Sequence, residues 1–389
     1  MAEKVLVLGG GFAGLESALL LRKNGLEVTL VSDREYVYIY PISIWIPTRE
    51  INFEDACFPL KEITVKTGIT FIVSPVTSID AEQREVRLQN EQTLTYDYLV
   101  LALGADKTTI KGIEHTGSIC GSPDAVLPIR DKLDDLIEKG HGHIAVGFGG
   151  NPKDPSAVRG GPAFEFMFNV HNLLKQKGVR DNFKLTMFAP MPKPGIRLGE
   201  KAYAMMTSWF DKLGIHRQYG IKIREFRQNE IIFADDSSIS ADLIMFIAAG
   251  KGHSILMNSS LPQNKAGFLR INDHCQVHGY NNIFAVGDSA ALDGPDWKAK
   301  QGHMAEVMAR VAAKNIISLH SGKQPSAGYQ KHLSVLCVMD FGNGAAYVYR
   351  DGKKEKVTPL PIVGHWLKKG WGHYWKLSRA GKIPRLPGM

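Results

Sequence analysis

The chain has 389 residues, of which 44% are apolar and 22% are charged, values typical of a globular protein with two or three domains. It contains no stretch of about eighteen or more uncharged apolar residues, so we expect no membrane-spanning helix. The first apolar strand begins almost at the N-terminus, and we therefore expect no signal peptide. The four cysteines (Cys57, Cys120, Cys275 and Cys337) lack the paired spacing of metal ligands, which argues against zinc and iron–sulfur sites.

The formal net charge is +8, and its placement along the chain matters more than its size. The segment from Asp351 to the C-terminus holds nine Lys or Arg and two acidic residues. The positive charge is therefore concentrated in one tail. Because no nucleic-acid-binding motif accompanies this charge, we expect no nucleic acid as a partner.

The chain opens with an apolar strand, a glycine-rich turn and a predicted helix from Leu15 to Asn24. The strand and turn read Lys4-Val-Leu-Val-Leu-Gly-Gly-Gly-Phe-Ala-Gly14. In this Gly-x-Gly-x-x-Gly pattern Gly9 permits the tight turn, Gly11 lets the backbone approach a pyrophosphate, and Gly14 lets the helix pack on the strand. The phosphates then meet the positive end of the helix. The pattern predicts a dinucleotide-binding unit.

Three later landmarks fall in the order that such a unit requires. Asp33 follows a second strand, Glu27–Ser32, at the position where a carboxylate accepts hydrogen bonds from ribose. A further strand, Tyr96-Asp-Tyr-Leu-Val-Leu-Ala-Leu-Gly-Ala105, carries Gly104 near its end. Much later comes Asn282-Ile-Phe-Ala-Val-Gly-Asp-Ser289, with Gly287 and Asp288. These segments resemble the FAD-binding motifs of the two-dinucleotide-fold flavoproteins, in which the acid of the last motif contacts the ribityl chain.

The order of the elements predicts an α/β protein with two Rossmann-like domains, the FAD domain being discontinuous. We expect the first part of the FAD domain at 1–110, a second Rossmann-like domain at 111–250, and the second part of the FAD domain at 251–320. A C-terminal segment for quinone and membrane association is expected at 321–389, with strands at 333–339 and 345–349.

The second module is the place where NADH binds in a pyridine-nucleotide oxidoreductase. Its strand, His143–Gly147, should lead into a second glycine-rich turn and a prompt helix. The loop instead reads Gly147-Phe-Gly-Gly-Asn-Pro-Lys-Asp-Pro-Ser-Ala-Val-Arg-Gly-Gly-Pro162, with two prolines before the helix expected at 161–177. This loop predicts only a poor NADH site.

The whole chain resembles the sulfide:quinone oxidoreductase family and the related flavocytochrome sulfide dehydrogenase flavoprotein. The resemblance rests on three segments: Asp33-Arg-Glu-Tyr-Val-Tyr-Ile-Tyr-Pro-Ile-Ser-Ile-Trp45, Gly160-Gly-Pro-Ala-Phe-Glu-Phe166 and Lys300-Gln-Gly-His-Met-Ala-Glu306. It implies FAD as the cofactor, sulfide or polysulfide as the electron donor and quinone as the acceptor. The resemblance also assigns Glu165 a proton-relay role and places the Lys300 cation beside the flavin, where it would stabilise the reduced form.

The family oxidises sulfide at a pair of cysteines, with a third cysteine assisting. Cys337 resembles the second member of the pair, and Cys120 resembles the assisting cysteine. The first member should lie just before the Gly-Pro-x-x-Glu helix, where this chain has Val158-Arg-Gly-Gly161 and no cysteine. Three possibilities follow: a persulfide on Cys337, a pairing of Cys120 with Cys337, or the loss of sulfide chemistry.

Aromatic and basic residues alternate in the tail from Gly364 to Arg379 at near-helical spacing. The aromatic and apolar set comprises Trp366, Leu367, Trp371, Tyr374, Trp375 and Leu377, and the basic set comprises Lys368, Lys369, Lys376 and Arg379. Such a segment suits a bilayer interface, with rings at headgroup depth and cations on anionic lipid. The alternative is that the rings pack on the body of the protein or in a homo-oligomer contact.

Our leading hypothesis is a peripheral membrane sulfide:quinone oxidoreductase. The first alternative is a type II NADH:quinone oxidoreductase, against which the proline-containing loop argues. The second is a flavoprotein electron-transfer module without cysteine chemistry.

Overall fold

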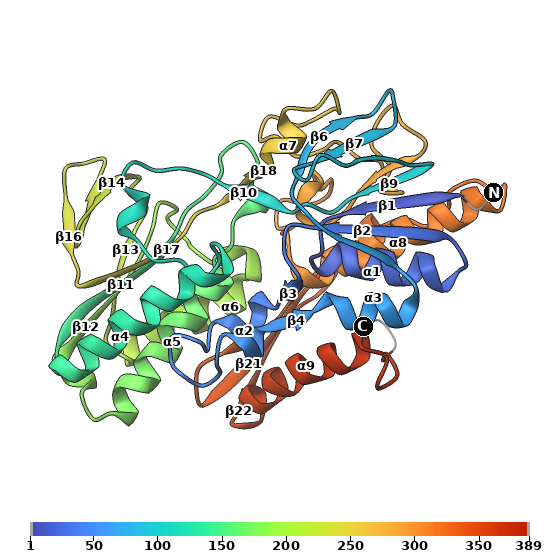
Figure 1. The fold of residues 1–389 in the computed structure, drawn as a ribbon. Helices are drawn as coiled ribbons and strands as arrows, with labels where there is room; N and C mark the ends of the chain where they lie inside the picture. The colour runs from blue at the N-terminus through green and yellow to red at the C-terminus, as the bar shows by residue number, and fades with distance from the viewer. Residues whose placement is uncertain (1–2, 387–389) are drawn as a thin grey trace.

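Two parallel β-sheets form the two halves of the molecule in the computed structural model, which describes residues 3–386 (Figure 1). The first half has a five-stranded sheet in the spatial order β19-β9-β1-β2-β5. Its strands are β1 (Lys4–Leu8), β2 (Glu27–Ser32), β5 (Thr70–Val73), β9 (Tyr98–Leu101) and β19 (Ile283–Ala285). Nearly every residue of β1, β9 and β19 is buried, as expected for parallel strands covered on both faces.

Helices α1 (Phe12–Lys23) and α8 (Gly302–His320) lie together against one face of this sheet, with α3 (Leu60–Thr67) beside them (Figure 1). The helix after the glycine-rich turn was expected to begin at Leu15. It begins three residues earlier, because Gly11 has an extended backbone and caps the helix, so that Gly14 lies inside its first turn. Two small antiparallel sheets complete this half: β3 (Tyr36–Tyr38) with β4 (Cys57–Pro59), and β6 (Val76–Asp80) with β7 (Glu85–Leu88) and β8 (Thr93–Thr95).

The second half has a four-stranded parallel sheet in the order β13-β12-β11-β17. Its strands are β11 (Gly142–Phe148), β12 (Phe183–Ala189), β13 (Ile215–Tyr219) and β17 (Leu243–Ile247). Its helices are α4 (Leu127–Lys139), α5 (Gly161–Gln176) and α6 (Glu200–Lys212), and an antiparallel sheet of β14 (Ile223–Arg227), β15 (Glu230–Phe233) and β16 (Ser238–Ser240) lies at its edge. The two short strands β10 (Ala105–Lys107) and β18 (Gly250–Gly252) pair where the chain passes between the halves.

The chain leaves the first sheet after β9 and returns to it at β19, which confirms the expected α/β fold with two Rossmann-like modules and a discontinuous first one. The domain boundaries themselves remain predictions. Short helical turns connect the elements, among them α2 (Tyr40–Ser43) and α7 (Ser254–Met257).

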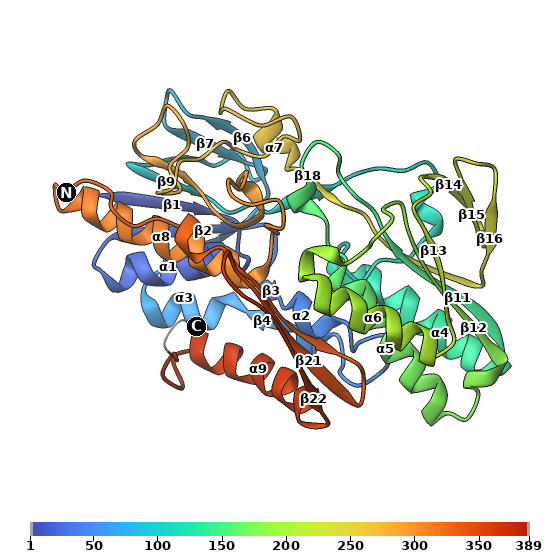
Figure 2. The same cartoon turned by 180° about the vertical axis from the view of Figure 1, so that it is seen from behind.

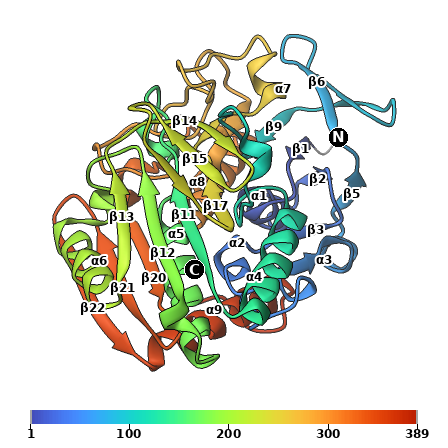
Figure 3. The same cartoon turned by 90° about the vertical axis from the view of Figure 1, so that its left-hand side faces the viewer.

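The C-terminal part is an antiparallel sheet followed by a long helix. The sheet consists of β20 (Val335–Asp340), β21 (Gly344–Arg350) and β22 (Glu355–Pro361), of which the last strand was not expected. It lies between the two halves, as Figure 2 shows, and helix α9 (Val363–Arg379) runs from it along the bottom of the molecule beneath the first half (Figure 3). In the described part of the chain, residues 3–386, none of the helices is both long and apolar enough to cross a membrane.

Candidate active site

The glycine-rich turn has the shape that a bound pyrophosphate needs. A Cβ atom on Gly9 would lie 2.2 Å from the Ala102 carbonyl oxygen, and one on Gly14 would lie 1.7 Å from that of Gly9, so neither position accepts a side chain. A Cβ on Gly11 would meet nothing within 4 Å. The space before the N-terminus of α1 is therefore open, and no acidic residue occupies the first turn of the helix. This arrangement fits an anionic phosphate group.

The ends of β9 and β19 meet beside this turn. The Gly104 amide donates to the Ser289 hydroxyl at 2.9 Å, which ties the two FAD-type motifs together. Gly287 has a φ of 64°, and a Cβ there would press at 3.2 Å on the Ala305 Cβ of α8. The structure thus brings Gly104, Gly287 and Asp288 to the end of the sheet that carries the glycine-rich turn.

Two of the predicted cofactor-binding acids are held by arginines. Asp33, at the end of β2, accepts two hydrogen bonds from the neighbouring Arg34, at 2.9 and 3.0 Å. Asp288 forms an ion pair with Arg159. Arg159 lies in the Val158–Gly161 segment, where the family's first cysteine was expected. The residue found in place of the expected cysteine is therefore a cation that binds one of the predicted cofactor-binding acids.

Lys300 is buried between the two halves. Its ammonium donates to the Ala290 carbonyl and lies 4.0 Å from the centre of the Phe268 ring. Burial lowers the pKa of Lys300 to about 7, and the Arg159 charge acts in the same direction. A cation that loses its proton this readily can respond to charge that develops on a nearby cofactor.

Cys337, a partly buried residue of β20, lies near the buried pair of Glu165 and Lys368. Glu165 comes from the first turns of α5 and forms an ion pair with Lys368 of α9. Burial raises the pKa of Glu165, and the Lys368 charge offsets part of this effect. Burial, followed by the Glu165 charge, raises the pKa of the Cys337 thiol to about 12. The thiol therefore needs a base before it can react as a thiolate.

Cys120 is buried in the loop before α4, and its charged neighbours are Lys107, Arg159 and Glu165. Burial raises the pKa of the Cys120 thiol, while the two cations act against this rise. Burial lowers the pKa of Lys107 to about 7. Lys107 was missed in the sequence analysis, because its partners lie far away in the chain. All four cysteines are free thiols, so Cys120 and Cys337 do not form a disulfide.

The loop after β11 is folded onto the protein rather than arranged around a ligand. The side chain of Asn151 is buried and donates to the Gly250 carbonyl at 2.8 Å. The Asp154 carboxylate accepts from the Ser156 amide at 3.0 Å and from the Asn264 side chain at 2.9 Å. Its polar groups are therefore used internally.

Helix α9 exposes only part of the aromatic and basic set that was expected at a bilayer interface. Its four basic side chains all bind protein groups: Lys368 binds Glu165, Lys369 binds Glu50, Lys376 binds the Asp55 carbonyl, and Arg379 binds Glu16 and Glu306. Trp375 is also buried. The expectation that the basic side chains meet lipid is wrong for Lys368 and Arg379, because buried carboxylates hold these two cations inside the protein. Of the expected apolar set, Trp366, Leu367 and Leu377 are exposed, and Ile362 and Val363 precede them.

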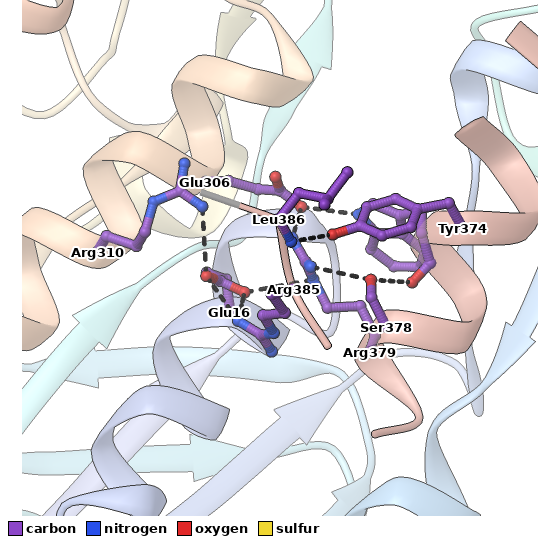
Figure 4. A network of polar contacts seen from close by, with 9 residues as sticks. Glu16, Glu306, Arg310, Tyr374, Ser378, Arg379, Arg385 and Leu386 are labelled. Carbon is purple, nitrogen blue, oxygen red and sulfur yellow. Dashed lines mark hydrogen bonds and ion pairs between the residues drawn. The ribbon is translucent and has the colours of Figure 1, made fainter. Parts of the chain in front are cut away.

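The C-terminal segment is also fixed to the helices of the glycine-rich half (Figure 4). Glu16 of α1 binds Arg379, Arg385 and Arg310, and Glu306 of α8 binds Arg379 at 2.6 Å. The indole of Trp375 donates to Glu306 at 2.7 Å and packs 4.8 Å from the ring of Phe12, which lies in the glycine-rich turn itself.

The chain belongs to the pyridine nucleotide-disulphide oxidoreductase family, whose model matches residues 3–313. Together with the cradle described above, this membership makes the protein an FAD-dependent oxidoreductase. When bound, FAD supplies a two-electron carrier between a donor and an acceptor. The residues that would hold it are Gly9, Gly11, Gly14, Asp33, Gly104, Gly287 and Asp288.

Two curated relatives are similar over most of the chain. The sulfide-quinone reductase of Aquifex aeolicus is 28% identical over 411 residues, covering 99% of this chain and 93% of the relative. A type II NADH:quinone oxidoreductase of Staphylococcus epidermidis is 26% identical, covering 93% and 94%. The solved structure of the sulfide:quinone oxidoreductase from Aquifex aeolicus superimposes with a TM-score of 0.87 at 25% identity, covering 98% of this chain and 92% of that one.

Proposed function

We propose that the protein is a sulfide:quinone oxidoreductase of the membrane surface, which passes electrons from sulfide through FAD to quinone. The observation that carries this proposal is the group of Cys337, Glu165 and Lys368, in which a thiol lies beside a buried carboxylate and its counter-ion. Similarity to the sulfide-quinone reductase of Aquifex aeolicus over 99% of this chain supports the same donor and acceptor.

In this proposal Cys337 takes up the sulfur. The thiol and hydrosulfide combine to a persulfide, releasing two protons and two electrons. Bound FAD would supply the acceptor for these two electrons, and the quinone would then take up two electrons and two protons. Glu165 accepts the proton of the Cys337 thiol, and the Lys368 charge favours the ionised form of Glu165 against the effect of burial on its pKa. Cys120, whose thiol also feels the Glu165 charge, assists.

The cations near Cys120 favour an anionic donor. Arg159 and Lys107 both act on the Cys120 thiol, and hydrosulfide and polysulfide are anions at neutral pH. Arg159 also supports the alternative function, a flavoprotein electron-transfer module without sulfide chemistry, because it stands where the family resemblance leads us to expect a thiol. The internal bonds of Asn151 and Asp154 argue against NADH as the donor.

The exposed face of α9 supports attachment to a membrane surface. Ile362, Trp366 and Leu367 are 68%, 66% and 52% exposed, although each is large and apolar. Large apolar side chains in such a patch mark a contact with another apolar body. We propose that they enter the headgroup region of a bilayer, where Trp is favoured. A homo-oligomer contact is the alternative, and sedimentation in the absence of lipid distinguishes it.

The proposal is tested by anaerobic stopped-flow measurement of flavin absorbance with sulfide and with NADH in separate experiments. Rapid bleaching by sulfide, followed by reoxidation with a soluble quinone, is the expected result. Bleaching by NADH alone would indicate a type II NADH:quinone oxidoreductase. If neither donor bleaches the flavin, the remaining alternative is a flavoprotein electron-transfer module without cysteine chemistry.

A further inference from the structure

A row of buried polar groups runs from Glu165 outward along β20 and α9 to the protein surface. The proposed function uses the inner members, Glu165 and Lys368. It leaves Asp340, His365 and Glu50 without a role, although burying charged groups costs several kcal/mol each unless they are paired. The contacts of these three residues form a continuous line.

The inner end of the row is closed off from water. Glu165, Lys368 and Asp340 are each no more than 6% exposed. The Asp340 amide donates to the Glu165 carboxylate at 2.9 Å. The Lys368 ammonium binds Glu165, and its charge also acts on the Asp340 carboxylate. The Lys368 charge therefore acts on both acids, and its ion pair is with Glu165.

The middle of the row is an imidazole that bridges two carboxylates. His365 Nδ1 lies 2.8 Å from Asp340 Oδ1, and its Nε2 lies 3.2 Å from Glu50 Oε2. The indole of Trp45 donates to the other Asp340 oxygen at 2.8 Å, which fixes that carboxylate in place. One of these contacts would be enough if His365 served only to balance the charge of a single carboxylate. The second contact joins the two carboxylates through the imidazole.

The outer end of the row reaches solvent. The Glu50 side chain is 25% exposed, and Lys369 binds it at 2.8 Å. His365 contacts the exposed Trp366 edge to face, with 5.9 Å between ring centroids. The opening therefore lies beside the exposed apolar face of α9.

We propose that Glu50, His365 and Asp340 form the proton inlet for quinone reduction, which ends at the buried pair of Glu165 and Lys368. This inference rests on the quinone half of the proposed function. A quinone takes up two electrons and two protons when it is reduced. One of these protons is the Cys337 proton already held by Glu165, and water supplies the other through Glu50. His365 gives the Nδ1 proton to Asp340 and recovers one at Nε2 from Glu50, so no charge accumulates in the interior. His365 is thus a positioning and relay residue rather than one that contacts quinone.

The groups that face His365 keep it able to donate from both nitrogens. They are Asp340 on β20, Glu50 after α2, and Lys368 and Lys369 on its own helix. The hydrogen bonds to Asp340 and then Glu50 raise the pKa of His365 to about 9, against the effect of burial. Burial works to raise the pKa of Asp340, but the His365 hydrogen bond and the Lys368 charge outweigh it and hold that pKa below its usual value.

The test compares His365→Gln with the matched control His373→Gln, an exposed histidine on the same helix. The flavin of each FAD-loaded protein is reduced with dithionite, so that no sulfide chemistry is involved, and is then mixed with a soluble quinone between about pH 6 and 9. We expect His365→Gln to reoxidise at least about tenfold more slowly, the size of a lost proton-transfer step. Added imidazole should restore the rate, and the control should match the unsubstituted protein.

A second readout does not depend on turnover. NMR titration of the histidine ring protons should place His365 near pH 9 in the unsubstituted protein. Glu50→Gln should move this midpoint downward, because the imidazolium then loses a carboxylate partner. An unchanged midpoint would contradict the bridging arrangement.

The outcomes separate this inference from the proposed function. If quinone does not reoxidise the flavin of the unsubstituted protein, the quinone half of the proposed function is refuted, and the inlet with it. If quinone does so, but His365→Gln reoxidises equally fast at every pH, only the inlet is refuted. A slow His365→Gln that imidazole does not rescue would show a structural role and would also overturn the relay.

Discussion

At the scale of single residues, Cys337 has a difficult environment for a nucleophile. Burial and the Glu165 charge raise the pKa of its thiol to about 12, so at neutral pH almost none of it is ionised. The function proposed for it depends on proton transfer to Glu165. Arg159 stands in the segment where the family resemblance led us to expect a further thiol.

We predict that Cys337→Ser abolishes flavin bleaching by sulfide while leaving reoxidation by quinone intact. A serine hydroxyl cannot form a persulfide, and the two side chains have nearly the same size. Stopped-flow absorbance measures both half-reactions. Cys57→Ser, at a half-buried thiol on β4, is the matched control and should behave like the unsubstituted protein. Unchanged bleaching in Cys337→Ser would show that another group receives the sulfur.

The bridging histidine should also make stability depend on pH. The folded-state pKa of His365 is raised to about 9, above its ordinary value near 6.5. Its contribution to the free energy of unfolding is therefore complete below about pH 6.5 and is lost as the pH rises through about 9.

We predict that the stability difference between the unsubstituted protein and His365→Gln shrinks over this range. The decrease should be at most about 3 kcal/mol, since one pKa unit corresponds to about 1.4 kcal/mol. Urea unfolding at a series of pH values measures it, with His373→Gln as the control. A difference that stays constant from about pH 6 to 10 would contradict the assigned partners.

At the scale of elements, helix α9 connects the exposed apolar face to the FAD cradle. Arg379 is almost completely buried between Glu16 of α1 and Glu306 of α8. Trp375 packs against Phe12 at the glycine-rich turn. Helix α9 thus stabilises the glycine-rich turn by packing against it. Loss of the ion pairs of α9 should therefore weaken the binding of FAD.

We predict that Arg379→Met destabilises the protein by about 3 kcal/mol, because two buried carboxylates lose a shared cation. The variant should also release FAD more readily, which filtration followed by flavin fluorescence measures. Arg49→Met is the matched control: Arg49 Nε binds Asp134 at 2.6 Å on the surface, where a pair contributes about 1 kcal/mol or less. Equal stability of the two variants would contradict a supporting role for α9.

The sequence predicted some elements well because their signals are local. The turn from Gly9 to Gly14, the parallel strands and α5 all follow from short apolar runs and glycine spacing. The face of α9 could not be predicted this way. Its cations point inward because they pair with Glu16, Glu165 and Glu306, which belong to helices far away in the chain. The alternation of aromatic and basic residues in the sequence does not reveal such partners.

Part of the candidate site could be predicted from the sequence, and part of it could not. Glu165, Cys120 and Cys337 came from motif resemblance, and the structure brings all three into one charged neighbourhood. Asp340 and His365 were missed because their bond exists only after β20 and α9 have packed. The one available signal was an acid, Asp340, in the strand that carries Cys337.

At the scale of the whole molecule, the exposed apolar face should determine attachment to membranes. The basic side chains of α9 are used internally, so binding should depend on apolar insertion more than on lipid charge. We predict sedimentation with neutral phosphatidylcholine vesicles, with little dependence on salt.

Leu367→Glu should weaken this sedimentation at least about tenfold, since burying a leucine contributes about 2 kcal/mol. Met257→Glu introduces the same charge at an exposed apolar residue of α7, on the far side of the molecule from α9 (Figure 1), and should bind normally. Equal loss in both variants would show that net charge, and not the face of α9, controls attachment.

The most direct test of electron transfer from sulfide to quinone through Cys337 is a single anaerobic turnover. Quinone reduction and the mass of the Cys337 peptide are measured in one sample. With sulfide and one equivalent of quinone, the account predicts reduced quinone together with a Cys337 peptide that is one sulfur atom heavier. Quinone that is reduced while Cys337 stays unmodified, or quinone that is not reduced at all, would contradict it.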